Sequence, residues 1–145
     1  STVETWRGYG IKNTVGVEVF HFTQFALSHT LLNYRSKSSA LENLRGSRIG
    51  AEMNFTFSAP LTNIQFGLGI TVSQMDYQEI EKSASFIGAG HFVSMGCNYF
   101  MSPTFSVQVI GKRLSTNYSG STGSVGFENL TSVSDNLSIG LAIWL

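Results

Sequence analysis

Charged side chains are the residues of this chain most able to do chemistry, and they are scarce. Only 12% of the 145 residues are charged, against roughly 25% in a typical soluble domain. Four of them occupy polar positions of otherwise alternating segments: Glu18, Arg48, Glu52 and Lys112. An isolated buried charge is costly, so buried charges must be paired. We expect these positions to face the interior of the molecule and to fill it with a salt-bridged polar plug, in which Arg48 and Lys112 neutralise Glu18 and Glu52. A narrow ion path through the same groups is the alternative.

Three histidines raise the question of nucleophilic catalysis or metal binding. A His–Ser site needs the base within hydrogen-bond reach of the hydroxyl. Ser28 and His29 are adjacent, and His91 and Ser94 differ in parity, so on a strand each pair points to opposite faces. None of the histidines, including His21, has a carboxylate or a second histidine two residues further on. We predict no catalytic, cofactor or metal site.

The elements that carry these residues alternate in polarity. Residues 47–58 and 63–73 alternate almost without error between apolar residues and polar residues or glycine, which is the period of a β-strand. One face is continuously apolar, and the other is polar with few charges. This pattern is typical of a strand with lipid on one side and a narrow polar interior on the other. Glycines 67, 69, 88, 90 and 96 fall on the inward faces, where we expect them to make room in a tight barrel.

Tight turns and longer loops alternate along the chain. Strands are predicted at 43–58, 63–77, 84–100, 104–117 and about 130–145, with proline-containing turns at 59–62 and 101–104 and longer loops at 35–44, 78–83 and 118–129. This order places the tight turns on one rim and the long loops on the other. The same asymmetry is typical of bacterial outer-membrane barrels.

The strand count depends on the first 42 residues. Residues 14–34 keep one parity throughout. They form either one long strand, giving six in total, or two strands that break near Thr23–Gln24. In the second case, residues 2–10 and a turn at Lys12–Asn13 supply a further strand, giving eight. Single-chain barrels usually have an even number of strands, with eight the usual minimum. We expect an all-β, antiparallel up-and-down transmembrane barrel of eight strands in one domain, residues 1–145; with six strands, the barrel would have to close between chains.

Aromatic residues occur near both rims. They are Tyr34, Tyr77 and Tyr118, where strands enter long loops, and Phe57, Tyr99 and Trp144, near the tight turns or the chain end. Amphipathic rings favour the level of the lipid headgroups. We predict that these residues form two aromatic girdles.

The last eight residues, SIGLAIWL, carry a family resemblance. Ser138, Gly140, Ile143 and Leu145 follow the pattern polar–x–Gly–x–x–apolar–x–apolar. This resembles the C-terminal signal by which the assembly machinery recognises outer-membrane barrels, although that signal usually ends in an aromatic residue and here Trp144 comes one place early. With the alternation and the two rims, residues 43–145 resemble the small outer-membrane barrels of the OmpA-transmembrane-domain, OmpX and Ail type.

The resemblance implies a place and partners. It implies the bacterial outer membrane, reached after removal of a signal peptide, with membrane lipid (including lipopolysaccharide) and the assembly machinery as partners, and a homo-oligomer if the barrel closes between chains. Nine basic and nine acidic residues cancel, so nothing indicates a nucleic-acid partner. We expect no cofactor and a structural, adhesive or interaction role through the external loops. A narrow pore or oligomeric channel component is the alternative, and a lipid A-modifying hydrolase or acyltransferase a further one, since some small barrels are such enzymes.

Overall fold

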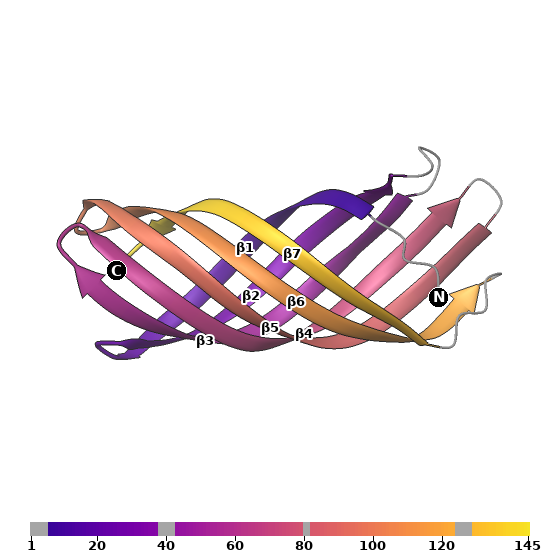
Figure 1. The fold of residues 1–145 in the computed structure, drawn as a ribbon, viewed down its shortest axis with the longest axis horizontal. Helices are drawn as coiled ribbons and strands as arrows, with labels where there is room; N and C mark the ends of the chain where they lie inside the picture. Colours follow the sequence, from indigo (N-terminus) through magenta and orange to yellow (C-terminus); the bar gives the residue numbers. More distant parts are fainter. Residues whose placement is uncertain (1–5, 38–42, 80–81, 124–128) are drawn as a thin grey trace.

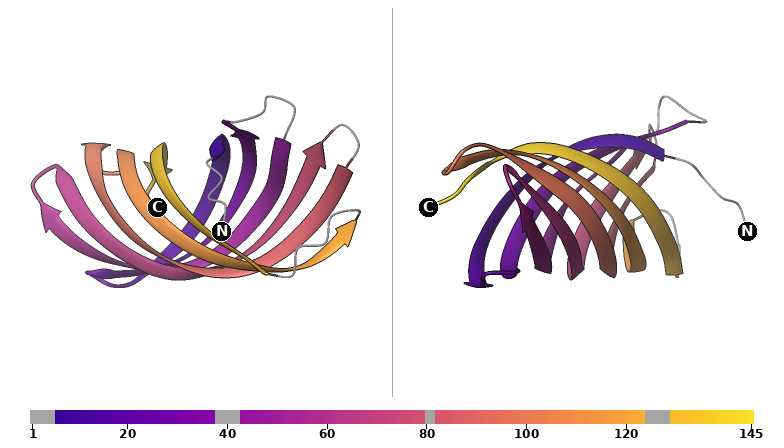
Figure 2. Two further views of the ribbon diagram at one scale, coloured as in Figure 1. Left: turned by 45° about the vertical axis from the view of Figure 1, so that its right-hand side comes forward. Right: turned by 60° about the vertical axis from the view of Figure 1, so that its left-hand side comes forward.

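The chain folds into one antiparallel sheet that coils toward a barrel (Figures 1 and 2). The computed structural model describes residues 6–37, 43–79, 82–123 and 129–145. Within these ranges the strands are β1 (Trp6–Phe20), β2 (Thr23–Ser36), β3 (Asn43–Ala59), β4 (Thr62–Glu79), β5 (Lys82–Ser102), β6 (Phe105–Gly123) and β7 (Asn129–Ile143). Each strand pairs with the next in chain order, and β1 and β7 are the two edges. The predicted all-β, antiparallel up-and-down architecture is confirmed. Seven strands lie in the described ranges, between the six and the eight that the sequence allowed.

The three tight turns lie on one rim. They are His21–Phe22, Pro60–Leu61 and Pro103–Thr104. In each turn the carbonyl of the second residue accepts a 2.8 Å hydrogen bond from a backbone amide further along the chain. The amide of Thr56 donates to Phe22, that of Phe100 to Leu61 and that of Trp144 to Thr104. Each turn is therefore tied to the chain beyond its own hairpin.

The sequence interpretation of the first hairpin was right about a break but wrong about a further turn. The chain reverses at His21–Phe22, directly before the break predicted near Thr23–Gln24, whereas the predicted turn at Lys12–Asn13 lies inside β1. A two-residue turn normally switches which parity faces inward. Here the register shifts between Glu18 and Phe20, and this β-bulge restores the original parity. The face pattern therefore continues unbroken across a turn that has neither Gly nor Pro.

Side-chain burial alternates along every strand from β2 to β6, but the distribution is the reverse of that in a soluble barrel. The outward residues nearest the tight turns are large, apolar and exposed, and on β4 they are Ile64, Phe66, Leu68, Ile70 and Val72. The inward residues at the same level are polar and buried, among them Asn54, Gln65, Thr71, Ser73 and Asn98. We call this apolar part of the outward surface the apolar belt. Its large outward residues on the other strands include Ile11, Val15 and Val17 (β1), Phe25, Leu27 and Leu31 (β2), Ile49 and Phe57 (β3), Ile87, Val93 and Met95 (β5), Val109 (β6), and Leu137, Ile139 and Leu141 (β7).

The strands are longer than a bilayer requires. They contain 14 to 21 residues, whereas about 9–11 tilted residues cross the hydrocarbon core. On β4 the outward face changes after Val72 to Gln74, Asp76 and Gln78, all exposed. The sheet therefore extends past the apolar belt at the end that carries the long loops. The described residues contain no helix long and apolar enough to cross a membrane.

Candidate functional site

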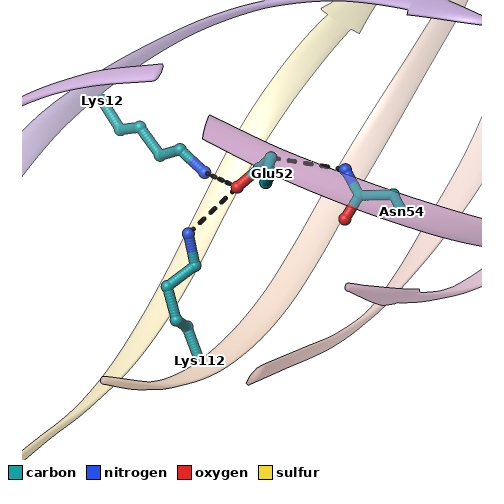
Figure 3. A network of polar contacts seen from close by, with 4 residues as sticks. All are labelled: Lys12, Glu52, Asn54 and Lys112. Carbon is teal, nitrogen blue, oxygen red and sulfur yellow. Dashed lines mark hydrogen bonds and ion pairs between the residues drawn. The ribbon is translucent and has the colours of Figure 1, made fainter. Parts of the chain in front are cut away.

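Three charged side chains from three strands meet inside the curled sheet. Glu52 on β3 is only 8% exposed. Its Oε2 lies 3.2 Å from the Lys112 Nζ on β6 and 3.5 Å from the Lys12 Nζ on β1, and its Oε1 accepts a hydrogen bond from Asn54 at 3.3 Å. Figure 3 shows both ammonium groups pointing at one carboxylate. The curl of the sheet makes this possible, since β1 and β6 are far apart in strand order.

Only part of the predicted charged network is assembled here. Glu52 and Lys112 do pair. Arg48 instead donates to the Ser73 Oγ at 3.0 Å, and Glu18 is exposed and lines a small cavity at the tight-turn end with His21 and Trp144. Neither contributes to the Glu52 network or to any other ion pair within the described residues, so the expected neutralisation of Glu18 by Arg48 or Lys112 was wrong. Lys12 was missed because the sequence placed it in a turn; its even parity on a continuous β1 would have identified it as inward.

Apolar and polar side chains fill the interior around this network. The Lys112 Nζ lies 3.7 Å from the centre of the Phe92 ring, a cation–π contact. Phe92 and Leu114 are almost fully buried, and Asn98 donates to Gln65 at 3.0 Å. The interior is a packed layer of side chains, as expected for a small barrel.

The interior changes character beyond the apolar belt. At the long-loop end, Met75, Ala84, Phe86 and Tyr118 form a buried cluster. Leu32, Tyr34, Leu44 and Tyr77 pack against it, and Trp6 meets Tyr77 edge-on with ring centroids 6.3 Å apart. We call this set the loop-end core. In this part of the molecule the inside is apolar and the outside polar, the ordinary arrangement of a protein in water.

The loop-end core corrects one of the two predicted girdles. Tyr34, Tyr77 and Tyr118 were expected on the lipid-facing surface, but they have inward parity and pack in the loop-end core. The reason is that the strands continue past the apolar belt, where an inward aromatic residue supplies a core. The signal was present in the sequence, because on β4 the apolar residues change face between Val72 and Met75.

Aromatic residues at the tight-turn rim do face outward. Phe57 and Tyr99, both predicted for this girdle, are exposed, as are Phe20, Phe22 and Phe66. Trp144 differs because its indole Nε1 donates to the buried Ser106 Oγ at 2.9 Å and its ring packs on Phe100. It therefore closes the interior at this rim and lies on the inner face.

The C-terminal residues of the predicted assembly signal lie at this rim as well. Ile143 ends β7 with its side chain exposed, Leu145 follows it, and Ser138 and Gly140 precede it on the same strand. Recognition of this strand by an assembly machinery stays a prediction.

The histidines do not form a site. His29 and His91 are exposed on the outward face, and His21 is at a turn. His91 is opposite Ser115 on β6, a cross-strand neighbour that the search along single strands missed, but no hydrogen bond joins them in the part of the chain that is described. The described part of the chain also holds no group of three His, Cys, Asp or Glu side chains suited to a metal ion. The tips of the long loops, at 38–42, 80–81 and 124–128, lie outside the described residues.

The fold and its inverted surface define a class of protein: a small, antiparallel, up-and-down β-sheet that curls toward a barrel and carries an apolar outward surface. The structure is similar to the crystal structure of Neisserial surface protein A, with a TM-score of 0.72 and 16% sequence identity over 94% of this chain and 83% of that chain. This likeness confirms the fold that the sequence predicted. The sequence matches no protein-family model, and no curated protein matches it either.

Proposed function

We propose that this chain is an integral, non-enzymatic protein of the bacterial outer membrane that acts through its loop-bearing end. The apolar belt is the observation that carries the proposal. Soluble monomers rarely expose contiguous apolar patches larger than a few hundred Å², yet here most outward positions over several strands are large and apolar, including Ile70 and Leu137. Lipid is the solvent that such a surface fits.

The loop-end core supports the second half of the proposal. A segment with an apolar interior and a polar exterior suits water, so the strand extensions would hold the long loops clear of the membrane on a packed base. A structural, adhesive or interaction role fits such a platform. The pore alternative is disfavoured because Glu52, Lys12, Lys112 and Phe92 occupy the interior together. In planar bilayers we expect no stable conductance steps.

Gel mobility and solubility test the membrane claim. We expect the unheated, folded protein to migrate faster than the boiled protein on SDS gels and to require detergent for solubility. Equal mobility before and after boiling, together with solubility in plain buffer, would overturn the proposal.

Thiol labelling of intact cells tests the orientation. The exposed native Cys97 is first replaced by Ser, and a single cysteine is then placed at Lys37 near the long loops or at Ala59 beside a tight turn. We expect a membrane-impermeant maleimide to label Lys37→Cys in intact cells and Ala59→Cys only after lysis. The reverse pattern would put the long loops in the periplasm.

A further inference from the structure

Three arginine side chains gather on the outward face just beyond the apolar belt. Arg7 (β1), Arg35 (β2) and Arg45 (β3) are all exposed, and we call them the arginine cluster. Arg7 is directly opposite Arg35. Arg45 is diagonal to Arg35, because Arg35 pairs with Asn43. Directly opposite Cβ atoms are about 4.5–5.5 Å apart and diagonal residues about 7–8 Å, so the three guanidinium groups share one small area of surface.

The arginine cluster is not neutralised by ion pairs in the described part of the chain. Within the described residues, none of its three side chains forms an ion pair. Asp76 is opposite Arg45 on β4, where it accepts a hydrogen bond from the Ser85 hydroxyl at 2.5 Å. Exposed Lys37 adds a further positive charge close to Arg35. Like charges directly opposite each other destabilise a sheet, so this arrangement favours an anion from outside the chain.

A fourth outward arginine provides the contrast. Arg113 on β6 also lies where the outward face turns from apolar to polar, and Asp135 on β7 accepts two hydrogen bonds from it, at 2.7 and 2.8 Å. The chain neutralises its own charge at this position. Among the described residues, no carboxylate pairs in this way with Arg7 or Arg35.

On each of the three strands, a single outward residue separates the arginine cluster from the apolar belt. Toward the membrane, the same faces of β1, β2 and β3 present Ile11, Leu31 and Ile49, all more than half exposed. Between them and the arginines lies exposed Tyr9, whose hydroxyl accepts a hydrogen bond from Asn33 at 3.5 Å. A ligand that carries phosphate next to acyl chains could occupy both surfaces at once.

We propose that the arginine cluster binds the phosphate groups of lipopolysaccharide, whose lipid A acyl chains lie along the apolar belt of β1–β3. The inference rests on the proposed function, because the long-loop rim meets the outer leaflet only if the chain spans the outer membrane. Guanidinium groups suit this ligand, since their planar donors bind phosphate oxygens in pairs.

Native mass spectrometry of the folded full chain in detergent tests the site with bisphosphorylated lipid A as the probe. We compare the unaltered protein, the triple variant R7Q/R35Q/R45Q and the single variant R35Q. The matched control is R113Q/D135N, which removes a neutral pair at a similar level. We expect the triple variant to bind lipid A about tenfold more weakly or worse, since several charge-assisted hydrogen bonds are lost. R35Q should fall between, and the control should bind as the unaltered protein does.

The remaining measurements distinguish lipopolysaccharide from other phosphate-bearing lipids, and failure of this inference from failure of the proposed function. Dephosphorylated lipid A and phosphatidylglycerol should both bind less tightly than the bisphosphorylated lipid. Equal binding by the triple variant or by dephosphorylated lipid A would overturn the site, and equal binding of phosphatidylglycerol would overturn the assignment to lipopolysaccharide. Heat-modifiable mobility is measured on the same samples. If the unaltered protein shows heat-modifiable mobility and every variant still binds lipid A, only this inference fails. If the unaltered protein shows no heat-modifiable mobility, the proposed function fails and this inference fails with it.

Discussion

At the scale of single residues, Glu52 holds the most consequential position. Its carboxylate is the shared anion of two inward lysines, and its side chain is 6% exposed. We expect Glu52→Gln to leave both ammonium groups without a counter-charge and to lower the free energy of unfolding by about 3–5 kcal/mol. Urea unfolding from detergent micelles measures this.

Glu18→Gln is the matched control for that prediction. Glu18 also has inward parity, but it is exposed on the edge strand and forms no ion pair within the described residues. Its replacement should change the unfolding free energy by less than about 0.5 kcal/mol. Similar losses in both variants would show that the Glu52 network has no special role in stability.

Gly69 gives a second residue-scale prediction. An added Cβ there would press on the Ala51 carbonyl and on the Phe92 ring that supports Lys112. We expect Gly69→Ala to cost about 1–3 kcal/mol of stability, the usual range for overpacking. At Gly111 an added Cβ would meet only the Met95 carbonyl, at an ordinary 3.8 Å, so Gly111→Ala should be tolerated. Equal thermal unfolding of the two variants would contradict the expected role of inward glycines in making room.

At the scale of strands, a location in the membrane predicts that the cost of introducing a lysine depends steeply on its position along the outward face. Leu68 lies in the middle of the belt on β4, and Gln74 lies on the same face beyond it. A lysine at the bilayer midplane costs about 2–4 kcal/mol, against about 0–1 kcal/mol near the interface. We therefore expect Leu68→Lys to be strongly destabilising in lipid vesicles and Gln74→Lys to be nearly neutral. Near-neutral values for both would indicate that this face meets water.

Strand parity also explains how much could be predicted. The alternation and the proline turns located β3, β4 and β5 closely, because turns at Pro60 and Pro103 are marked by residue type. The end of β6 was wrong, because the strand continues to Gly123 through residues that the sequence assigned to a loop at 118–129. The β1–β2 turn could be placed only as one of two alternatives, near Thr23–Gln24, since a bulge near Glu18 kept the parity continuous and His21–Phe22 carries no turn signal. The partners of Lys112 could not be found either. Sequence gives the face of a side chain, whereas the curl of the whole sheet decides which strands face each other.

At the scale of the molecule, closure of the barrel depends on how the backbone groups at the edges β1 and β7 are hydrogen-bonded. Lipid offers no hydrogen bonds to an unpaired strand edge, so each unsatisfied backbone group would cost several kcal/mol. The sheet already curls far enough for Lys12 on β1 and Lys112 on β6 to reach the same oxygen of Glu52. This degree of curl favours closure within one chain over a wider barrel shared between copies.

We therefore expect the protein to be monomeric in detergent by light scattering, with backbone amides of β1 and β7 exchanging hydrogen as slowly as those of β4. Slow exchange at both edges in a dimer would instead mean that the barrel closes between two copies, in which case the Glu52 network would be repeated around a wider interior. Fast exchange confined to β1 and β7 would mean that the edges stay unpaired. That outcome would conflict with the apolar belt, because an open edge and a lipid-facing surface cannot coexist on the same strand.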